Sequence, residues 1–232
     1  MELIGEGIAE ALRLLLNLDP EVLDITFLSL RLSGLATLLS LFFGLPLGTL
    51  LALGQFPTRR LWLSLINTGM GLPPVVVGLG VSILLWRSGP LGRLGLIYTP
   101  AAIILAQVII AAPIVIGLTA AALQQLDPQL RLQLLGLGAS RWQMIVLLWR
   151  EARLPLLAAL MAGFGAVISE VGAVIMVGGN LKGHTRVLTT AIVLETGRGE
   201  FALAIALGVI LLLLTFAINF TLTSIQQRSV RR

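Results

Sequence analysis

The sequence predicts an all-α, polytopic membrane protein with five transmembrane helices per subunit, preceded by one amphipathic helix. The first observation is that 57% of the 232 residues are hydrophobic and only 12% are charged, which is unlike a water-soluble domain. The second is a mean hydropathy of +0.99. The third is that apolar residues form runs of about 20 or more, the length a helix needs to cross a hydrocarbon core of about 30 Å. Strand-type alternation is absent from these runs, so helices are predicted rather than a barrel.

The first predicted element is an interfacial amphipathic helix over residues 1–17. Its polar residues recur at spacings of three and four, so they share one helical face. The polar face holds Glu2, Glu6, Glu10, Arg13 and Asn17, and the opposite apolar face holds Ile4, Ile8, Leu12, Leu15 and Leu16. A helix of this kind lies on the bilayer in contact with lipid. Packing against the rest of the protein is the alternative.

Five apolar runs follow, in a transmembrane bundle that covers residues 25–225. The predicted spans are residues 25–54, 61–86, 98–123, 154–177 and 201–225. Short connections separate most of them, but a long insert follows the third span and a glycine-rich loop follows the fourth. Residues 1–232 are therefore predicted to form a single transmembrane domain.

The second span contains two consecutive prolines, Pro73 and Pro74. Each lacks an amide donor and collides with the preceding turn, so this helix is predicted to kink. Glycines lie on both sides of the prolines, at positions 69, 71, 78 and 80, where they allow a neighbouring helix to approach closely or expose backbone amides. The kink is interpreted either as a broken helix that lines a solute path or as a bend required only for packing.

A polar insert at residues 122–153 interrupts the apolar runs. Its helix signals are an N-cap with a proline in the first helical position, a pair of glycines, and a capping box. These residues are Asp127, Pro128, Gly136, Gly138, Ser140 and Gln143. The insert is therefore predicted to form a helix, a glycine-containing turn and a second helix.

The insert also has the composition of a docking surface. It combines the basic residues Arg131 and Arg141 with apolar side chains that a solvated spacer would not need. The apolar residues are Leu130, Leu134, Leu137 and Trp142. A surface that is both apolar and positively charged, and is held outside the bilayer, predicts contact with another protein.

Several segments carry a resemblance to a known family. The "GAS" of residues 138–140 matches the centre of a pattern whose Glu-Ala-Ala positions read Leu132, Gln133 and Leu134 here, and the Leu154-Pro155 pair falls about one helical turn late. That pattern is the cytoplasmic EAA loop of the permease subunits of binding-protein-dependent ABC importers. The segments "GLPPVVVGLG" (71–80) and "ISEVGAVIMVGGNLKGHTRVLTTAI" (168–192) look like those of molybdate and tungstate permeases. With the ending "RVLTTAIVLETGRGEFALAIALG", the chain is most similar to the tungstate type.

The resemblance implies the type I ABC importer permease fold and a transport function. It implies a homodimer with the pore between two copies, an extracytoplasmic oxyanion-binding protein, and two copies of a cytoplasmic ATPase subunit. The insert would be the coupling loop through which ATP-driven closure of the ATPase drives alternating access for tungstate or molybdate. The implied coupling residues are Asp127, Arg131, Leu134, Gly138, Ala139, Ser140 and Arg141. The alternatives are a sulfate- or phosphate-type permease and an ATP-independent secondary transporter.

The chain itself is not expected to be an enzyme. It has no Gly-x-x-x-x-Gly-Lys-Ser/Thr phosphate loop, and its sole lysine, Lys182, is followed by glycine. ATP and Mg²⁺ are therefore assigned to the partner ATPase, and no cofactor to this chain. One histidine and no cysteine leave no metal cluster. Arginines at membrane boundaries indicate contact with lipid rather than with nucleic acid.

Polar residues near the end of the fourth span are candidates for an anion path. A tetrahedral oxyanion needs N–H and O–H donors that hold it weakly enough to release it. The candidate donors are Ser169, Asn180, Thr185, Thr189 and Thr190, and the broken helix at Pro73 and Pro74 in the second span is also assigned to the path. Glu170 would repel an anion, and a carboxylate inside a span is costly unless it is paired. It is predicted to pair with Arg31 of the first span or to cap amides of the "VGGN" turn at 177–180.

The predicted location is the cytoplasmic (inner) membrane of a bacterium or archaeon. If "PTRR" at 57–60 is cytoplasmic, five crossings place the insert and the basic tail "QQRSVRR" at 226–232 inside, and the acidic N-terminus outside. Basic residues also occur on the other side, so the positive-inside rule favours this orientation only weakly.

Overall fold

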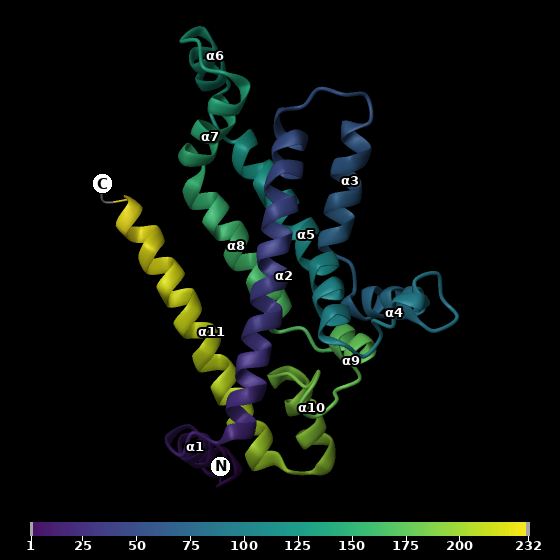
Figure 1. Ribbon diagram of the computed structural model, residues 1–232. Helices are drawn as coiled ribbons and strands as arrows, with labels where there is room; N and C mark the ends of the chain where they lie inside the picture. Colours follow the sequence, from purple (N-terminus) through teal and green to yellow (C-terminus); the bar gives the residue numbers. More distant parts are fainter. Residues whose placement is uncertain (1, 231–232) are drawn as a thin grey trace.

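A computed structural model of the chain (Figure 1) describes residues 2–230, with side chains for residues 3–227, so most of the basic tail lies outside the described side chains. All regular structure in the described backbone is helical, and no strand occurs among these residues. Its elements are α1 Glu2–Leu16, α2 Pro20–Leu53, α3 Arg59–Met70, α4 Pro74–Leu85, η1 Gly92–Leu94, α5 Pro100–Gln124, α6 Pro128–Gly136, α7 Arg141–Glu151, α8 Arg153–Ile168, α9 Gly172–Gly178, α10 Leu188–Arg198 and α11 Phe201–Val230.

The prediction of a helical membrane protein is confirmed, with three to five candidate spans. In the described part of the chain, α2, α5 and α11 are each long and apolar enough to cross a membrane, and two bent pairs bring the number to five if each pair is one span. These pairs are α3 with α4, bent by 103°, and α7 with α8, bent by 74°. The run at 154–177 is not one helix: α8 ends at Ile168 and the short α9 begins at Gly172.

Helices α2 and α5 form the centre of the bundle and pack through small residues. A Cβ added at Gly44 would lie 2.7 Å from Cγ1 of Val115, and one added at Gly48 would lie 2.6 Å from Cβ of Thr119. In a lipid bilayer there is no hydrophobic driving force between helices, so close approach stabilises their association through dispersion contacts. Gln107 of α5 adds a polar tie, because its Nε2 donates to the carbonyl oxygen of Val167 on α8 at 3.1 Å.

Helix α1 forms as predicted and packs crosswise on the start of α11 (Figure 1). The face of α1 that contacts α11 carries small residues. Ala11 is buried there, and a Cβ added at Gly7 would collide with Ile205 of α11. Of the predicted apolar face, Ile4, Ile8, Leu12 and Leu16 remain exposed, whereas Leu15 packs against the buried cluster that includes Leu207. The two interpretations made from the sequence are therefore compatible, since one face packs on protein while another is free to meet lipid.

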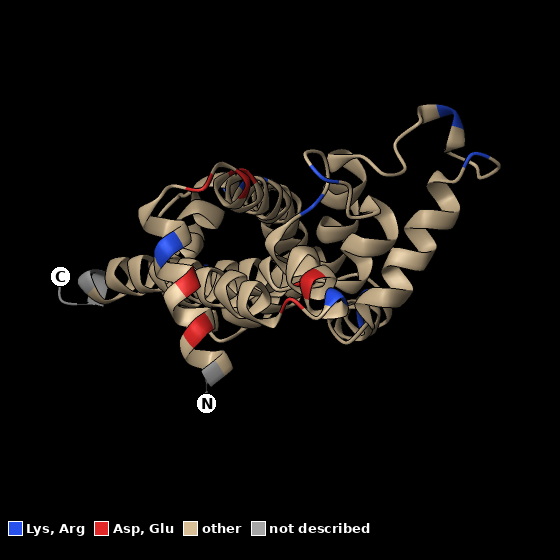
Figure 2. Ribbon diagram, turned by 90° about the horizontal axis from the view of Figure 1, so that it is seen from below, with Lys and Arg blue, Asp and Glu red and all other residues tan. Residues whose placement is uncertain are grey.

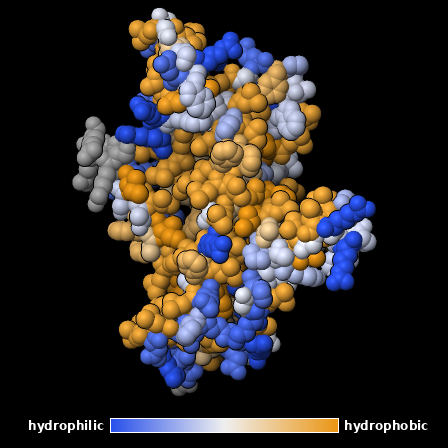
Figure 3. Space-filling model, in the orientation of Figure 1, coloured by the Kyte–Doolittle hydropathy of each residue, from blue (hydrophilic) through white to orange (hydrophobic). Residues whose placement is uncertain are grey.

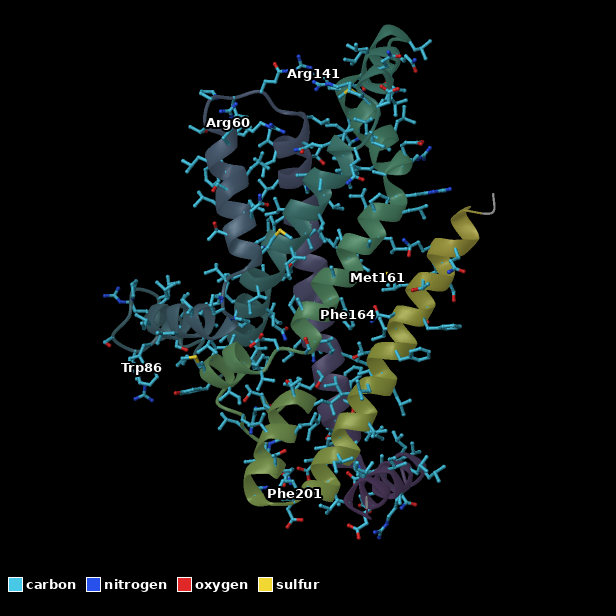
Figure 4. The ribbon with its side chains drawn as sticks, turned by 180° about the vertical axis from the view of Figure 1, so that it is seen from behind. Arg60, Trp86, Arg141, Met161, Phe164 and Phe201 are labelled. Carbon is cyan, nitrogen blue, oxygen red and sulfur yellow. The ribbon has the colours of Figure 1, made fainter. Side chains whose placement is uncertain are left out.

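The surface is divided into an apolar band and two hydrophilic ends. Figure 3 shows hydrophobic residues over the middle of the molecule, and Figure 2 shows charged residues on α1 and on loops, with most of the visible helical ribbon uncharged. Helices α1 and α6 lie at opposite ends, and α11 runs from the α1 end toward the α6 end (Figure 1). Figure 4 places Arg60 and Arg141 at the α6 end and Phe201 at the other.

One helix was not predicted. Residues 188–198, assigned to a glycine-rich loop, form α10. The signal was present in Thr190, whose Oγ1 accepts a hydrogen bond from the amide of Val187 at 3.0 Å, as a residue in the first turn can do for the residue before a helix. Glycines at 178, 179, 183, 197 and 199 surround the segment and suggested a loop.

Candidate functional site

The insert forms the predicted helix, turn and helix. Asp127 caps α6, since its Oδ1 accepts from the amide of Gln129 at 2.8 Å. Ser140 and Gln143 form both hydrogen bonds of the capping box at the start of α7. Gly138 follows the end of α6 and has a φ of 84°. Its amide donates to the carbonyl oxygen of Leu135, and the amide of Ala139 donates to the carbonyl oxygen of Leu134. This is a Schellman turn, and its left-handed position favours glycine.

The outer surface of the insert is apolar. Leu137, in the turn, is 85% exposed, and Leu132 and Trp142 are also exposed. A hollow of about 690 Å³ lies between the turn and α7. We call this surface the apolar tip; it consists of Leu132, Leu134, Leu137, Gly138, Ala139, Trp142 and Leu147. Contiguous exposed apolar surface beyond the spans marks a protein contact.

The inner surface of the insert is fixed to the bundle. Met144 and Leu148 of α7 are buried against Ala122 and Leu123 at the end of α5. The indole Nε1 of Trp149 donates to Oγ1 of Thr49 on α2 at 2.8 Å. The insert is therefore attached to both central helices by packing and by a polar contact that joins residues 100 positions apart.

Arg131 connects the insert to the bundle. Its Nη1 donates to the carbonyl oxygen of Leu53 at 3.2 Å, at the C-terminus of α2. Arg59 donates to the carbonyl of Leu51 at 2.7 Å in the same place. Both guanidinium groups thus satisfy carbonyls that the end of a helix leaves unpaired. Arg141 is exposed.

The two prolines break the second span completely. Pro73 precedes α4 and Pro74 occupies its first position, after a 103° change of direction from α3. Helix α4 then crosses α9 in backbone contact: a Cβ added at Gly78 would lie 2.6 Å from Cα of Ala173. Both broken helices therefore meet, which a sequence that shows each break separately does not reveal.

Glu170 caps the short helix α9. Its Oε1 accepts from the amide of Ala173 at 2.9 Å, and its own carbonyl accepts from Oγ1 of Thr189 at 2.8 Å. Glu170 was predicted to cap amides of the "VGGN" turn at 177–180, at the C-terminal end of α9. It caps an amide at the N-terminal end of this helix instead. Among the described residues, no ion pair joins Glu170 to Arg31, because the carboxylate is turned toward the helix that it caps.

Replacing Glu170 with leucine is expected to lower the free energy of unfolding by about 1–3 kcal/mol, since the buried amide of Ala173 loses its acceptor. Glu170→Gln keeps an acceptor oxygen and should cost less. Thermal unfolding in detergent measures both. Adding Arg31→Glu to Glu170→Arg should give no recovery of stability; recovery would show that the two side chains pair after all.

The candidate donors gather in the segment between α9 and α10, but most of them bind backbone. Thr185 donates to the carbonyl of Gly178 at 2.6 Å, and Thr190 donates to that of Val187 at 3.0 Å. The Nδ2 of Asn180 donates to the carbonyl of Thr190 at 3.3 Å. These threonines are buried and hold the segment in shape. Ser169 is exposed, at the break between α8 and α9.

An apolar helical bundle that carries a helical insert with an exposed apolar tip is the arrangement expected of a membrane subunit that contacts a separate protein. The chain belongs to the family of binding-protein-dependent transport system inner membrane components, whose profile matches residues 44–232. Its members are permease subunits of ABC transporters, which have no ATPase site of their own; the ATPase is a separate subunit.

The chain is similar to named permease proteins of tungstate and molybdenum transport systems. The tungstate uptake system permease protein TupB of Peptoclostridium acidaminophilum is 41% identical over 98% of this chain and 100% of its own. The protein of the same name from Campylobacter jejuni is 36% identical over 95% of this chain and 92% of its own. The molybdenum transport system permease protein ModB of Escherichia coli K12 is 30% identical over 85% of this chain and 93% of its own.

A solved structure supports the fold. An inward-facing form of the MetNI methionine ABC transporter matches with a TM-score of 0.73, covering 90% of this chain and 96% of that one. At 18% identity, this similarity concerns the fold alone.

Proposed function

We propose that this chain is the permease subunit of an ABC importer that carries tungstate across the cytoplasmic membrane of its cell. The observation that carries the proposal is the 41% identity to a tungstate permease along the full length of both chains. The identity to the molybdenum permease is lower, at 30%. The apolar tip supports the same function, because it offers another protein a surface that no membrane protein needs for folding.

The working unit in this proposal is a homodimer with five spans per copy and the path between the copies. The α6 end faces the cytoplasm and meets two ATPase subunits, which bind ATP and Mg²⁺. The α1 end faces outward and receives a soluble oxyanion-binding protein, with α1 at the membrane interface. The exposed leucines and isoleucines of α1 and the basic residues Arg59, Arg60 and Arg141 at the α6 end support this orientation.

In the proposed coupling step, the ATPase subunit binds the apolar tip. Closure of the ATPase subunits on ATP moves both tips together and turns the path outward, and hydrolysis returns it inward. The packing of Met144 and Leu148, and the bond from Trp149 to Thr49, would pass this motion to α5 and α2. Asp127 and Ser140 contribute by fixing the shape of the insert.

The anion path is proposed to run past the breaks at Pro73–Pro74 and at Ser169. At such breaks, backbone amides that lie outside the helix hydrogen bonds can face an anion, although Glu170 already occupies the amide of Ala173. Thr185, Thr189 and Thr190 act as braces for the α9–α10 segment, according to the carbonyls that they bind. Weak, dispersed contacts of this kind suit a conduit, which must release what it binds.

Uptake by the reconstituted complex tests the proposal. The chain is purified with its ATPase and binding protein and placed in liposomes loaded with ATP. Uptake of tungstate is expected to require ATP and the binding protein, and to persist in excess sulfate. Uptake driven by an ion gradient without the ATPase would identify a secondary transporter, and preference for molybdate or sulfate would reassign the cargo.

A further inference from the structure

One charged side chain, Arg31, lies within an apolar stretch of α2. Arg31 is the only ionisable residue of α2 after Asp24, and it lies about 9 Å along the helix from Ile25, inside the apolar run. It is exposed. Within the described residues, it takes part in no ion pair or hydrogen bond. In Figure 3, a hydrophilic patch interrupts the apolar band on the face where α2 lies.

Such an arginine is costly in lipid, so its position calls for water or an anion. An ionised side chain inside a span almost always faces a water-filled cavity or a partner of opposite charge. The carboxylate predicted as that partner, Glu170, is engaged at Ala173. Arg31 is therefore available to a ligand that is absent from the chain itself.

Arg31 lines a pocket of about 460 Å³, whose other lining residues come from the first turns of α2 and from the segment between α9 and α10. Its charged lining residues are Glu21, Asp24, Arg31, Lys182 and Arg186, three basic and two acidic. Glu21 is shared by two of the bases, at 2.7 Å from Nζ of Lys182 and 3.7 Å from Nη1 of Arg186. The charged lining residues therefore carry one more positive than negative charge.

Arg186 adds a second unpartnered donor. Its side chain is 13% exposed, and its Nε is buried with no hydrogen-bond partner among the described residues. A buried N–H without an acceptor costs about 1–3 kcal/mol, so a ligand that supplies an oxygen there would be favoured. Lys182, by contrast, is well exposed and stands at the rim.

We propose that this pocket is the receiving site for the oxyanion on the outer side of the permease, with Arg31 as its innermost ligand. The inference rests on the proposed function, because it takes its ligand, a tetrahedral dianion, from that function. Guanidinium groups bind oxyanions through paired N–H donors. Glu21 competes with the anion for Lys182 and Arg186, which keeps the site weak enough for the anion to move on. The same chemistry would accept a lipid phosphate, and the labelling experiment below distinguishes this ligand from the free anion.

Chemical labelling tests binding without requiring transport. Lys182 is the only lysine, so reaction with an amine-selective acylating reagent, followed by mass spectrometry of its peptide, reports on this pocket alone. In the purified complex in lipid-free detergent, tungstate should slow the labelling of Lys182 by about threefold or more, and sodium chloride of equal ionic strength should not. Arg31→Gln should remove the protection. Equal protection by chloride, protection that survives Arg31→Gln, or protection only by an anionic lipid would overturn the proposal.

Uptake separates this inference from the proposed function. If the wild-type complex imports tungstate, Arg31→Gln should reduce uptake by about tenfold or more, as expected for loss of a charged hydrogen bond. Arg93→Gln removes the same charge from an exposed residue of η1, remote from the pocket lining, and should leave uptake unchanged. Normal uptake by Arg31→Gln would reject the receiving site and leave the function standing, whereas no uptake by the wild type would reject the function.

Discussion

ATP-driven uptake is expected to fall by about 100-fold or more when Leu137 is replaced by aspartate, while the permease still folds. Leu137 is the most exposed large hydrophobic residue of the apolar tip, at 85%, so it contributes nothing to the packing of its own chain. Burial of a leucine in a groove of the ATPase is worth about 1.5–3 kcal/mol, and a carboxylate placed there adds an unpaired charge. Copurification of the ATPase and tungstate uptake measure the effect.

The conservative change Leu137→Met is the matched control. It keeps volume and apolar character, and should retain both ATPase binding and uptake. Size-exclusion profiles of the two variants should match that of the wild type, because neither change touches the bundle. Unimpaired uptake by Leu137→Asp would mean that the tip is not the coupling surface.

Replacing Gly78 with leucine is expected to destabilise the permease by several kcal/mol or to prevent its assembly. The first added carbon would lie 2.6 Å from Cα of Ala173 and 3.2 Å from Sδ of Met176. The first of these neighbours is backbone and cannot move aside alone, so α4 and α9 must separate. The thermal midpoint in detergent and the yield of folded protein measure the loss.

Gly80→Leu is the control for this change. It lies two residues further along the same helix, and a Cβ there meets nothing within 4 Å. Both variants change helix propensity equally, so a difference between them reports on the α4–α9 crossing. Equal stability of the two variants would contradict the backbone contact that joins the broken helices.

Local signals in the sequence predicted local structure well. The caps at Asp127 and Ser140, the turn at Gly138 and the break at Pro73–Pro74 all depend on residues within a few positions of one another. The same holds for the long apolar helices α2, α5 and α11, whose length is dictated by the membrane. Such features need no knowledge of how the helices are arranged.

Features that depend on packing were predicted less well. The hydrogen bond from Arg131 to Leu53, 78 residues away, was not predicted. Glu170 was paired with Arg31 by depth in the membrane, and depth does not specify which way a side chain turns. The break at Ser169 has no proline to mark it, and α10 is masked by neighbouring glycines, so neither stood out from the pattern alone.

The joint between α7 and α8 determines how the transporter handles force. A single buried residue, Ala152, separates the two helices at their 74° bend. A joint this short leaves little freedom between the two helices, so in the proposed coupling step a movement of α7 is passed directly to α8. Glycine insertions that loosen this joint should therefore cause ATP hydrolysis without transport, which should be rare in the intact protein.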